Sequence, residues 1–201
     1  MKTKQTRKGF TLMELIVVIA IMGILLAIIV PSWGYFLRRA HERDAGSKAK
    51  IVFNAAQTEA TRLNVKERLI INQLNDPTID TQKEKVLKDQ IYMGTGEFYF
   101  YWNGKSGYKC DSKGVDAKAS TKANDAFSRA LNGVVGLNRG DGTYKIYVNN
   151  YNVISVIYSD YENGRYKGTY PVGMTDLSDT LKSKIRSHSV QAAEMSDFKL
   201  P

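Results

Sequence analysis

The sequence predicts an α+β fold in which one long N-terminal helix packs on a small antiparallel sheet. Three observations support this prediction. From Phe10 to Val30, every residue except Thr11 and Glu14 is apolar or glycine. Later segments alternate in the way that strands do, with turn residues between them. Between these two regions, apolar residues recur at spacings of three and four, which marks one face of a helix: Ala45, Ala49, Val52, Ala56, Ala60 and Leu63.

The apolar run, residues 10–30, is long enough to span a bilayer as a helix. Glu14 interrupts it near its start. A carboxylate in hydrocarbon costs roughly 2.5–3.5 kcal/mol on insertion scales and less near the interface, so an intramembrane acid is a functional candidate that needs a partner. The alternative is that Glu14 lies at the membrane interface and reaches water.

The helix is expected to continue beyond the apolar run as an amphipathic half. A continuous helix from Phe10 to Leu63 would be about 80 Å long at 1.5 Å per residue. Pro31 lies inside it and is expected to kink or locally break it, because proline lacks the backbone donor and clashes with the preceding turn.

The remaining chain predicts short helices and strands. Capping residues favour helices that begin near Asp80 and Ser120, and residues from Thr175 form a third candidate helix. Residues 97–102 alternate as a strand and then meet turn residues at 103–104. Residues 143–170 contain three more strand-like segments at the spacing of an antiparallel meander.

Aromatic residues in these strands predict the two faces of the sheet. Phe98, Phe100 and Trp102 alternate with Tyr99 and Tyr101. Tyrosines suit a surface that is partly apolar and partly wet. We therefore expect a half-exposed sheet to carry four of them: Tyr99, Tyr101, Tyr158 and Tyr166.

Composition indicates one membrane-anchored domain that is held together by its core. The chain has 201 residues with 43% hydrophobic and 24% charged residues, which is ordinary for a folded protein. The net charge of +9 comes partly from a basic leader without acids, and the rest is too scattered to indicate nucleic acid by itself. Cys110 is the single cysteine, so no intramolecular disulfide can form.

An enzyme is not predicted. His41 and His188 are the two histidines, and neither stands at metal-ligand spacing with the other or with Cys110. We expect no catalytic residues, no metal and no cofactor. Arg139, Gly140 and Asp141 spell a tripeptide known from cell adhesion, but ordinary turn chemistry explains them better.

The N-terminus resembles the class III signal of type IV pilins and related pseudopilins. The residues that carry the resemblance are a short basic leader ending in Gly9, then Phe10, Thr11, Leu12, Met13 and Glu14, and then the apolar run. The resemblance covers about the first thirty residues and implies a pilin fold for the rest. The absence of a disulfide favours a Gram-positive source.

The resemblance also implies roles for particular residues. Prepilin peptidase would cleave between Gly9 and Phe10 and methylate the new amine of Phe10. Glu14 would then pair with the Phe10 amine of a neighbouring subunit, where a charge left alone in low dielectric is costly. The segment between Gly23 and Pro31 would be a helix break in assembled filaments, although a simple kink remains the alternative.

The expected organisation has three parts: a leader (residues 1–9), a membrane and filament-core half of the helix (residues 10–37), and an extracellular head (residues 38–201). The expected function is a structural pilus subunit, a single-pass membrane protein before assembly and a surface protein afterwards. Its partners would be other copies in a homo-oligomeric filament, prepilin peptidase, the pilus assembly platform and membrane lipid.

Two alternatives remain open at this stage. The first is a pseudopilin of a type II secretion or competence system, which uses the same leader and helix. The second is a minor or tip pilin that binds DNA or a surface through a stretch of lysines, although a solvated face is the favoured explanation of the same residues. These lysines are Lys105, Lys109, Lys113, Lys118 and Lys122. Motility, adhesion and DNA uptake cannot be distinguished from the sequence.

Overall fold

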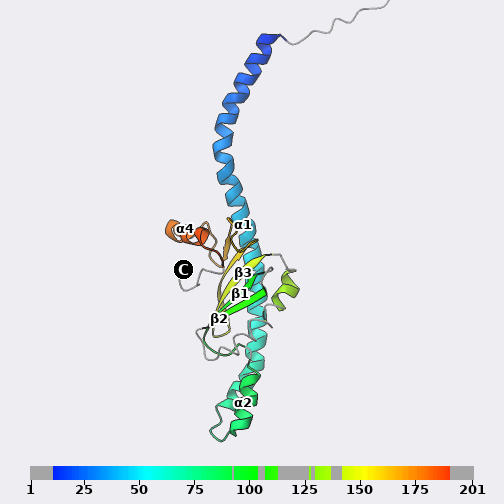
Figure 1. Ribbon diagram of the computed structural model, residues 1–201, viewed down its shortest axis with the longest axis vertical. Helices are drawn as coiled ribbons and strands as arrows, with labels where there is room; N and C mark the ends of the chain where they lie inside the picture. Colours follow the sequence, from blue (N-terminus) through cyan, green and yellow to red (C-terminus); the bar gives the residue numbers. More distant parts are fainter. Residues whose placement is uncertain are drawn as a thin grey trace, which may run out of the picture. The chain divides into compact units, whose positions relative to one another are not determined.

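The computed structural model describes residues 11–91, 93–103, 107–112, 127, 130–136 and 142–190, of which Ser32, Phe98 and residues 107–112 are described by their backbone alone. Helix α1 (Leu12–Leu74) comes first, followed by α2 (Thr81–Asp89) and, near the C-terminus, by α4 (Asp179–Ser187). Between α2 and α4 lie the five strands of one sheet (Figure 1). The chain separates into two units with the boundary between Ala40 and His41. The second unit, residues 41–201, is called the head unit below.

The sheet is antiparallel throughout and has the strand order β2-β1-β3-β4-β5. Its members are β1 (Glu97–Asn103), β2 (Gly107–Ser112), β3 (Thr143–Asn149), β4 (Asn152–Ser159) and β5 (Gly168–Tyr170). The predicted strands and the meander from β3 to β5 are confirmed. The sequence did not predict that β1 lies beside β3, with Phe100 opposite Ile146.

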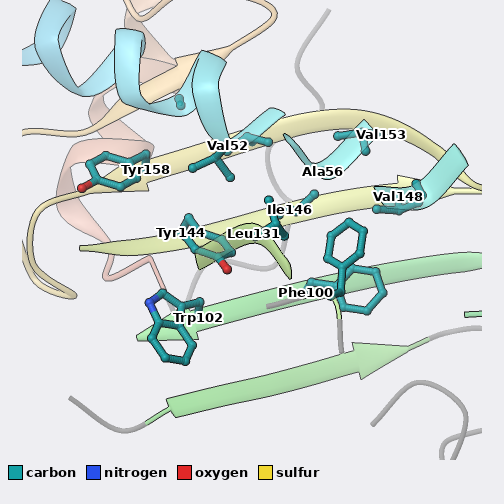
Figure 2. Packing of buried hydrophobic residues seen from close by; sticks show 14 of the residues in the cluster. Val52, Ala56, Phe100, Trp102, Leu131, Tyr144, Ile146, Val148, Val153 and Tyr158 are labelled. Atoms are coloured by element: carbon teal, nitrogen blue, oxygen red, sulfur yellow. The ribbon is translucent and has the colours of Figure 1, made fainter. Parts of the chain in front are cut away.

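The amphipathic half of α1 covers one face of this sheet. The predicted stripe is confirmed, because all six of its residues are at most 2% exposed. Figure 2 shows Val52 and Ala56 packed over the side chains that β3 and β1 direct toward the helix, among them Ile146 and Phe100. Four of the six stripe residues are alanines. Small side chains let the helix approach the sheet closely. The main core of the head unit is the interface between α1 and the sheet.

A second apolar cluster covers the opposite face of the sheet. Residues from the C-terminal part of the described chain pack on Tyr99 and Tyr101, and they are Met174, Leu177, Ile185 and Val190. The expectation of half-exposed tyrosines was wrong for three of the four. Tyr99 and Tyr101 are 3% and 4% exposed beneath this second cluster, and Tyr158 is 3% exposed in the core on the α1 side. Tyr166 is half-buried, and its ring stacks on the imidazole of His41 with the ring centroids 4.6 Å apart.

The helices differ from prediction mainly in length. Helix α1 continues to Leu74, eleven residues beyond the predicted end at Leu63. Helix α2 is confirmed; Asp80 occupies its N-cap position but makes no side-chain capping bond. Residues 130–135 are helical, whereas the predicted start at Ser120 lies outside the described residues. Helix α4 is confirmed, and the hydroxyl of Ser178 accepts the N–H of Leu181 at its N-terminus.

Removing residues 1–34 is expected to yield a soluble, folded monomer. The described core of the head unit forms among residues 45–190, while large exposed hydrophobic side chains crowd residues 12–37. Exposed apolar surface of that extent drives association in water. Size-exclusion chromatography and near-ultraviolet circular dichroism check the result. Aggregation, or loss of the near-ultraviolet signal, would show that the head unit depends on the apolar residues.

Gly168→Ala is expected to destabilise this truncated protein by about 1–3 kcal/mol, because overpacking a close contact forces the backbone to shift. A Cβ atom at Gly168 in β5 would overlap the backbone of Ala45 and Gly46 in α1. Gly46→Ala is the matched control, since a Cβ atom there meets no atom within 4 Å. Denaturant unfolding measures both variants. Equal stability of Gly168→Ala and the parent would contradict the close approach of β5 and α1.

Candidate functional site

Glu14 forms a reciprocal capping box with Thr11 at the start of α1. Its Oε2 accepts the backbone N–H of Thr11 at 2.9 Å and the Thr11 hydroxyl at 2.9 Å. In return, the Glu14 N–H donates to Thr11 Oγ1 at 3.3 Å. Such a box satisfies N–H groups that have no partner within the helix. The S/T-x-x-E spacing in the sequence was the signal for this motif, and it was missed.

The capping box changes what Glu14 requires. Both of its residues follow the predicted cleavage point, so processing would leave the box intact. In the single chain, the carboxylate therefore has local donors before any neighbouring subunit arrives. Gly9 and Phe10, the predicted cleavage and methylation residues, lie outside the described residues.

The first part of α1 presents an uncovered apolar surface. Within the described part of the chain, α1 is the one helix that is long and apolar enough to cross a membrane. The most apolar 18-residue window has a mean hydropathy of 3.0, and none of it is buried. Ile24 and Val30, for example, are each 64% exposed. Exposure of so large an apolar surface to water is unfavourable, which indicates that lipid or protein covers this segment.

Gly23 and Pro31 both lie within the continuous helix α1. Neither residue ends the helix in the single chain. A Cβ atom at Gly23 would meet no atom within 4 Å, so packing within the chain does not require glycine there. A helix break between these two residues in an assembled filament stays a prediction.

Two buried glutamates extend the apolar stripe of α1 at its two ends. Glu42 lies three residues before Ala45 and is 6% exposed, and Glu67 lies four residues after Leu63 and is fully buried. Neither was predicted from the sequence, although their spacing places them on the stripe. A buried carboxylate needs donors, and each of these reaches a distant segment of the head unit.

Glu42 holds the C-terminal helix. Its two oxygens accept Nε and Nη2 of Arg186 in α4 at 2.7 and 2.9 Å. Close by, the buried Lys167 donates to the carbonyl of Arg186 at 3.1 Å and to that of Gly164 at 2.9 Å. Burial lowers the pKa of Lys167 below its ordinary value. These contacts fix the covering layer on the second face of the sheet.

Glu67 holds the segment that precedes β1 and the β3–β4 turn. Its carboxylate accepts the N–H groups of Met93 and Gly94 at 3.0 and 2.8 Å. It also accepts the hydroxyl of Tyr151 at 2.8 Å. Burial is the main cause that raises the pKa of Tyr151 above its ordinary value, and the hydrogen bond to Glu67 is the second cause. Both buried glutamates thus act as structural clamps on α1.

Other candidates from the sequence are not located by the structure. Four of the five lysines and the Arg139–Asp141 tripeptide lie outside the described residues, and Lys109 and Cys110 are described by backbone alone. Nucleic-acid binding, which the sequence did not favour, is therefore not tested by the described residues. Among the described side chains, no group of three or more histidines, cysteines and acids could hold a metal ion.

Comparison with known proteins concerns the N-terminal segment. Residues 4–30 match the family model described as the prokaryotic N-terminal methylation motif. Over 42 residues, the chain is 50% identical to the fimbrial protein EcpC of Eikenella corrodens. That stretch covers 21% of this chain and 28% of the relative, so the chain matches less than a third of the relative's length. No solved structure matches the chain.

The matched residues and the structure overlap in the N-terminal part of α1. The methylation motif occupies the leader and the exposed apolar part of α1, and the amphipathic part of α1 lies on an antiparallel sheet as in a pilin fold. The N-terminal segment is therefore similar to that of type IV pilin-like proteins. In the relative this segment belongs to a fimbrial protein, and in this chain it contains a helix that is long and apolar enough to cross a membrane.

Proposed function

We propose that this protein is a structural subunit of a type IV pilus. Prepilin peptidase cleaves it after Gly9 and methylates Phe10, the apolar part of α1 holds it in the membrane as a single span, and the assembly platform then transfers it into a surface filament. The observation that carries this proposal is the methylation motif at residues 4–30, which runs directly into an apolar helix with no buried residues in its most apolar window.

Assembly rather than catalysis is the proposed chemistry. The same apolar surface serves twice, because lipid covers it before assembly and neighbouring helices cover it in the filament. The charge of Glu14 would pair with the Phe10 amine of the next subunit, and this pairing would set the register between subunits. In the head unit, Glu42 and Glu67 already accept hydrogen bonds within the chain. The head would therefore stay folded on the surface of the filament without contributing these two carboxylates to subunit contacts.

The same N-terminal segment also suits a pseudopilin or a minor pilin. Immunogold labelling of the cell surface distinguishes these cases. Label along filament shafts supports a major pilin, and label at tips alone supports a minor pilin. Absence of label on any surface filament would favour a pseudopilin.

Processing is expected to give a mature chain that begins at N-methylated Phe10. The basic leader that ends in Gly9, followed at once by Phe10, is the reason for this expectation. Mass spectrometry of protein sheared from cells measures the N-terminal peptide. Gly9→Val should abolish the cleavage, while Thr11→Val, on the other side of the junction, should preserve it. A mature terminus at Met1 or beyond Val30 would contradict the proposal.

A further inference from the structure

The surface of α1 changes character just before the head unit begins. Aliphatic side chains give way to aromatic ones at Trp33, Tyr35 and Phe36, which are 58–68% exposed. Two arginines follow, Arg38 and Arg39. Within the described chain, neither guanidinium has a hydrogen bond or an ion pair. The order along the helix is thus aliphatic, aromatic and cationic.

The aromatic residues form a shaped surface. Trp33 and Phe36 lie with ring centroids 6.5 Å apart and planes tilted by 42°. Together with Ile28 and Ile29 they line an open groove of about 310 Å³. All four side chains that line it are apolar, so the groove suits a hydrocarbon chain better than a polar ligand.

The distance along the helix matches a bilayer. Trp33 lies about 28 Å from Glu14 along the axis at 1.5 Å rise per residue. The hydrocarbon core of a typical bilayer is about 30 Å thick. If Glu14 and its capping box lie at one interface, Trp33 falls at the other. Tryptophan and tyrosine concentrate at that depth because their rings are amphipathic.

We propose that residues 28–39 form a phospholipid-binding girdle at the head-side face of the membrane. The end of an acyl chain occupies the groove beside Trp33 and Phe36, and Arg38 and Arg39 bind lipid phosphate groups. Charge favours a phospholipid over a second copy of this helix, because a copy would bring its own adjacent arginines to the same level. This inference rests on the proposed membrane helix and adds its depth and its lipid contacts.

Depth-dependent fluorescence quenching tests the girdle in the full chain. The chain has two tryptophans, so Trp102→Phe leaves Trp33 as the single reporter. The variant is inserted into phosphatidylcholine vesicles that carry a nitroxide at the headgroup, high on the acyl chain, or near the bilayer centre. The expected result is the largest loss of Trp33 fluorescence with the two shallow quenchers and the smallest loss with the central one.

Two matched reporters define the scale. Ile24→Trp, in the background Trp33→Phe and Trp102→Phe, should be quenched most by the central nitroxide, because residue 24 lies midway between Glu14 and Trp33. Trp33→Phe alone leaves Trp102, which is 7% exposed in the head unit and should not be quenched. Changing Arg38 and Arg39 to leucine should let residue 33 move deeper and shift its quenching toward the central probe.

The outcomes separate this inference from the proposed function. Central quenching of Trp33, or no quenching of Trp33 while Ile24→Trp is quenched, would overturn the girdle and leave the membrane helix standing. No quenching of either reporter would overturn both. Loss of Trp33 quenching as protein density rises at constant lipid composition would assign the groove to a second copy of the chain and would also overturn the lipid assignment.

Discussion

Glu14→Leu is expected to abolish surface filaments while the protein still inserts into the membrane and is still cleaved. The change makes the span more apolar and leaves Gly9 and Phe10 untouched. In the proposed filament, however, it would leave the methylated amine of each subunit without a carboxylate. Breaking a buried pair by removing one partner typically costs about 3–5 kcal/mol. Repeated at every subunit, this cost disfavours the polymer strongly.

The capping box requires controls that separate geometry from charge. Glu14→Gln keeps an acceptor oxygen for Thr11 but removes the charge, so it should lose filaments as leucine does. Thr11→Val removes the hydroxyl from the box but keeps the carboxylate. Losing a cap costs about 1 kcal/mol, which is small beside the loss of the ion pair, so Thr11→Val should still form filaments.

The measurement compares processed subunit in the membrane fraction with sheared surface filament for each variant. Normal filament yield from Glu14→Leu would eliminate the pairing role and support a carboxylate that only lies at the interface. Normal yield from Glu14→Gln together with loss in Glu14→Leu would assign Glu14 to the capping box. The predicted pattern is loss in both Glu14 variants and retention in Thr11→Val.

The main face of the head was predictable from sequence because its signals are local. The spacing of the six stripe residues fixes which side of α1 is buried, and the alternation around Phe100 and Trp102 fixes which side of β1 meets it. Burial on the opposite face depends on residues 174–190, which are distant in sequence. Alternation shows that Tyr99 and Tyr101 share a face but does not show what covers it.

The length of α1 was underestimated for a specific reason. The apolar stripe ends at Leu63, and the next position on the same face is the charged residue Glu67. A charge on a stripe normally marks the end of the buried segment. Here the acid is buried because three donors from later in the chain converge on it. No pattern within the helix shows those donors, so the helix end and the clamp were missed together.

The turn that Glu67 holds has an unusual residue in it. Asn150 and Tyr151 form the two-residue connection between β3 and β4, with φ of 48° and 64°. Positive φ at both positions normally selects asparagine followed by glycine. A tyrosine with positive φ is strained, and such a conformation persists only when contacts with the surrounding structure enforce it. Its ring is 5% exposed in the core and its hydroxyl donates to Glu67, so burial and this bond offset the strain.

Glu67→Leu is therefore expected to destabilise the truncated protein by at least about 3 kcal/mol, since each buried donor left without an acceptor costs about 1–3 kcal/mol. Met93, Gly94 and Tyr151 supply those donors. Against a total stability of about 5–15 kcal/mol for a typical domain, this loss is severe. Denaturant unfolding at neutral pH measures it.

Glu59→Leu on the same helix is the matched control. Glu59 is 9% exposed, but its partner Arg62 is largely exposed, and a pair of that kind contributes less than about 1 kcal/mol. A cycle of Glu67→Gln, Tyr151→Phe and the double variant then isolates the bond across the turn, with an expected coupling of about 0.5–3 kcal/mol for residues in contact. If Glu67→Leu and Glu59→Leu lose the same stability, or if the cycle shows no coupling, the clamp does not hold the turn, and the left-handed conformation of Tyr151 depends on ring burial alone.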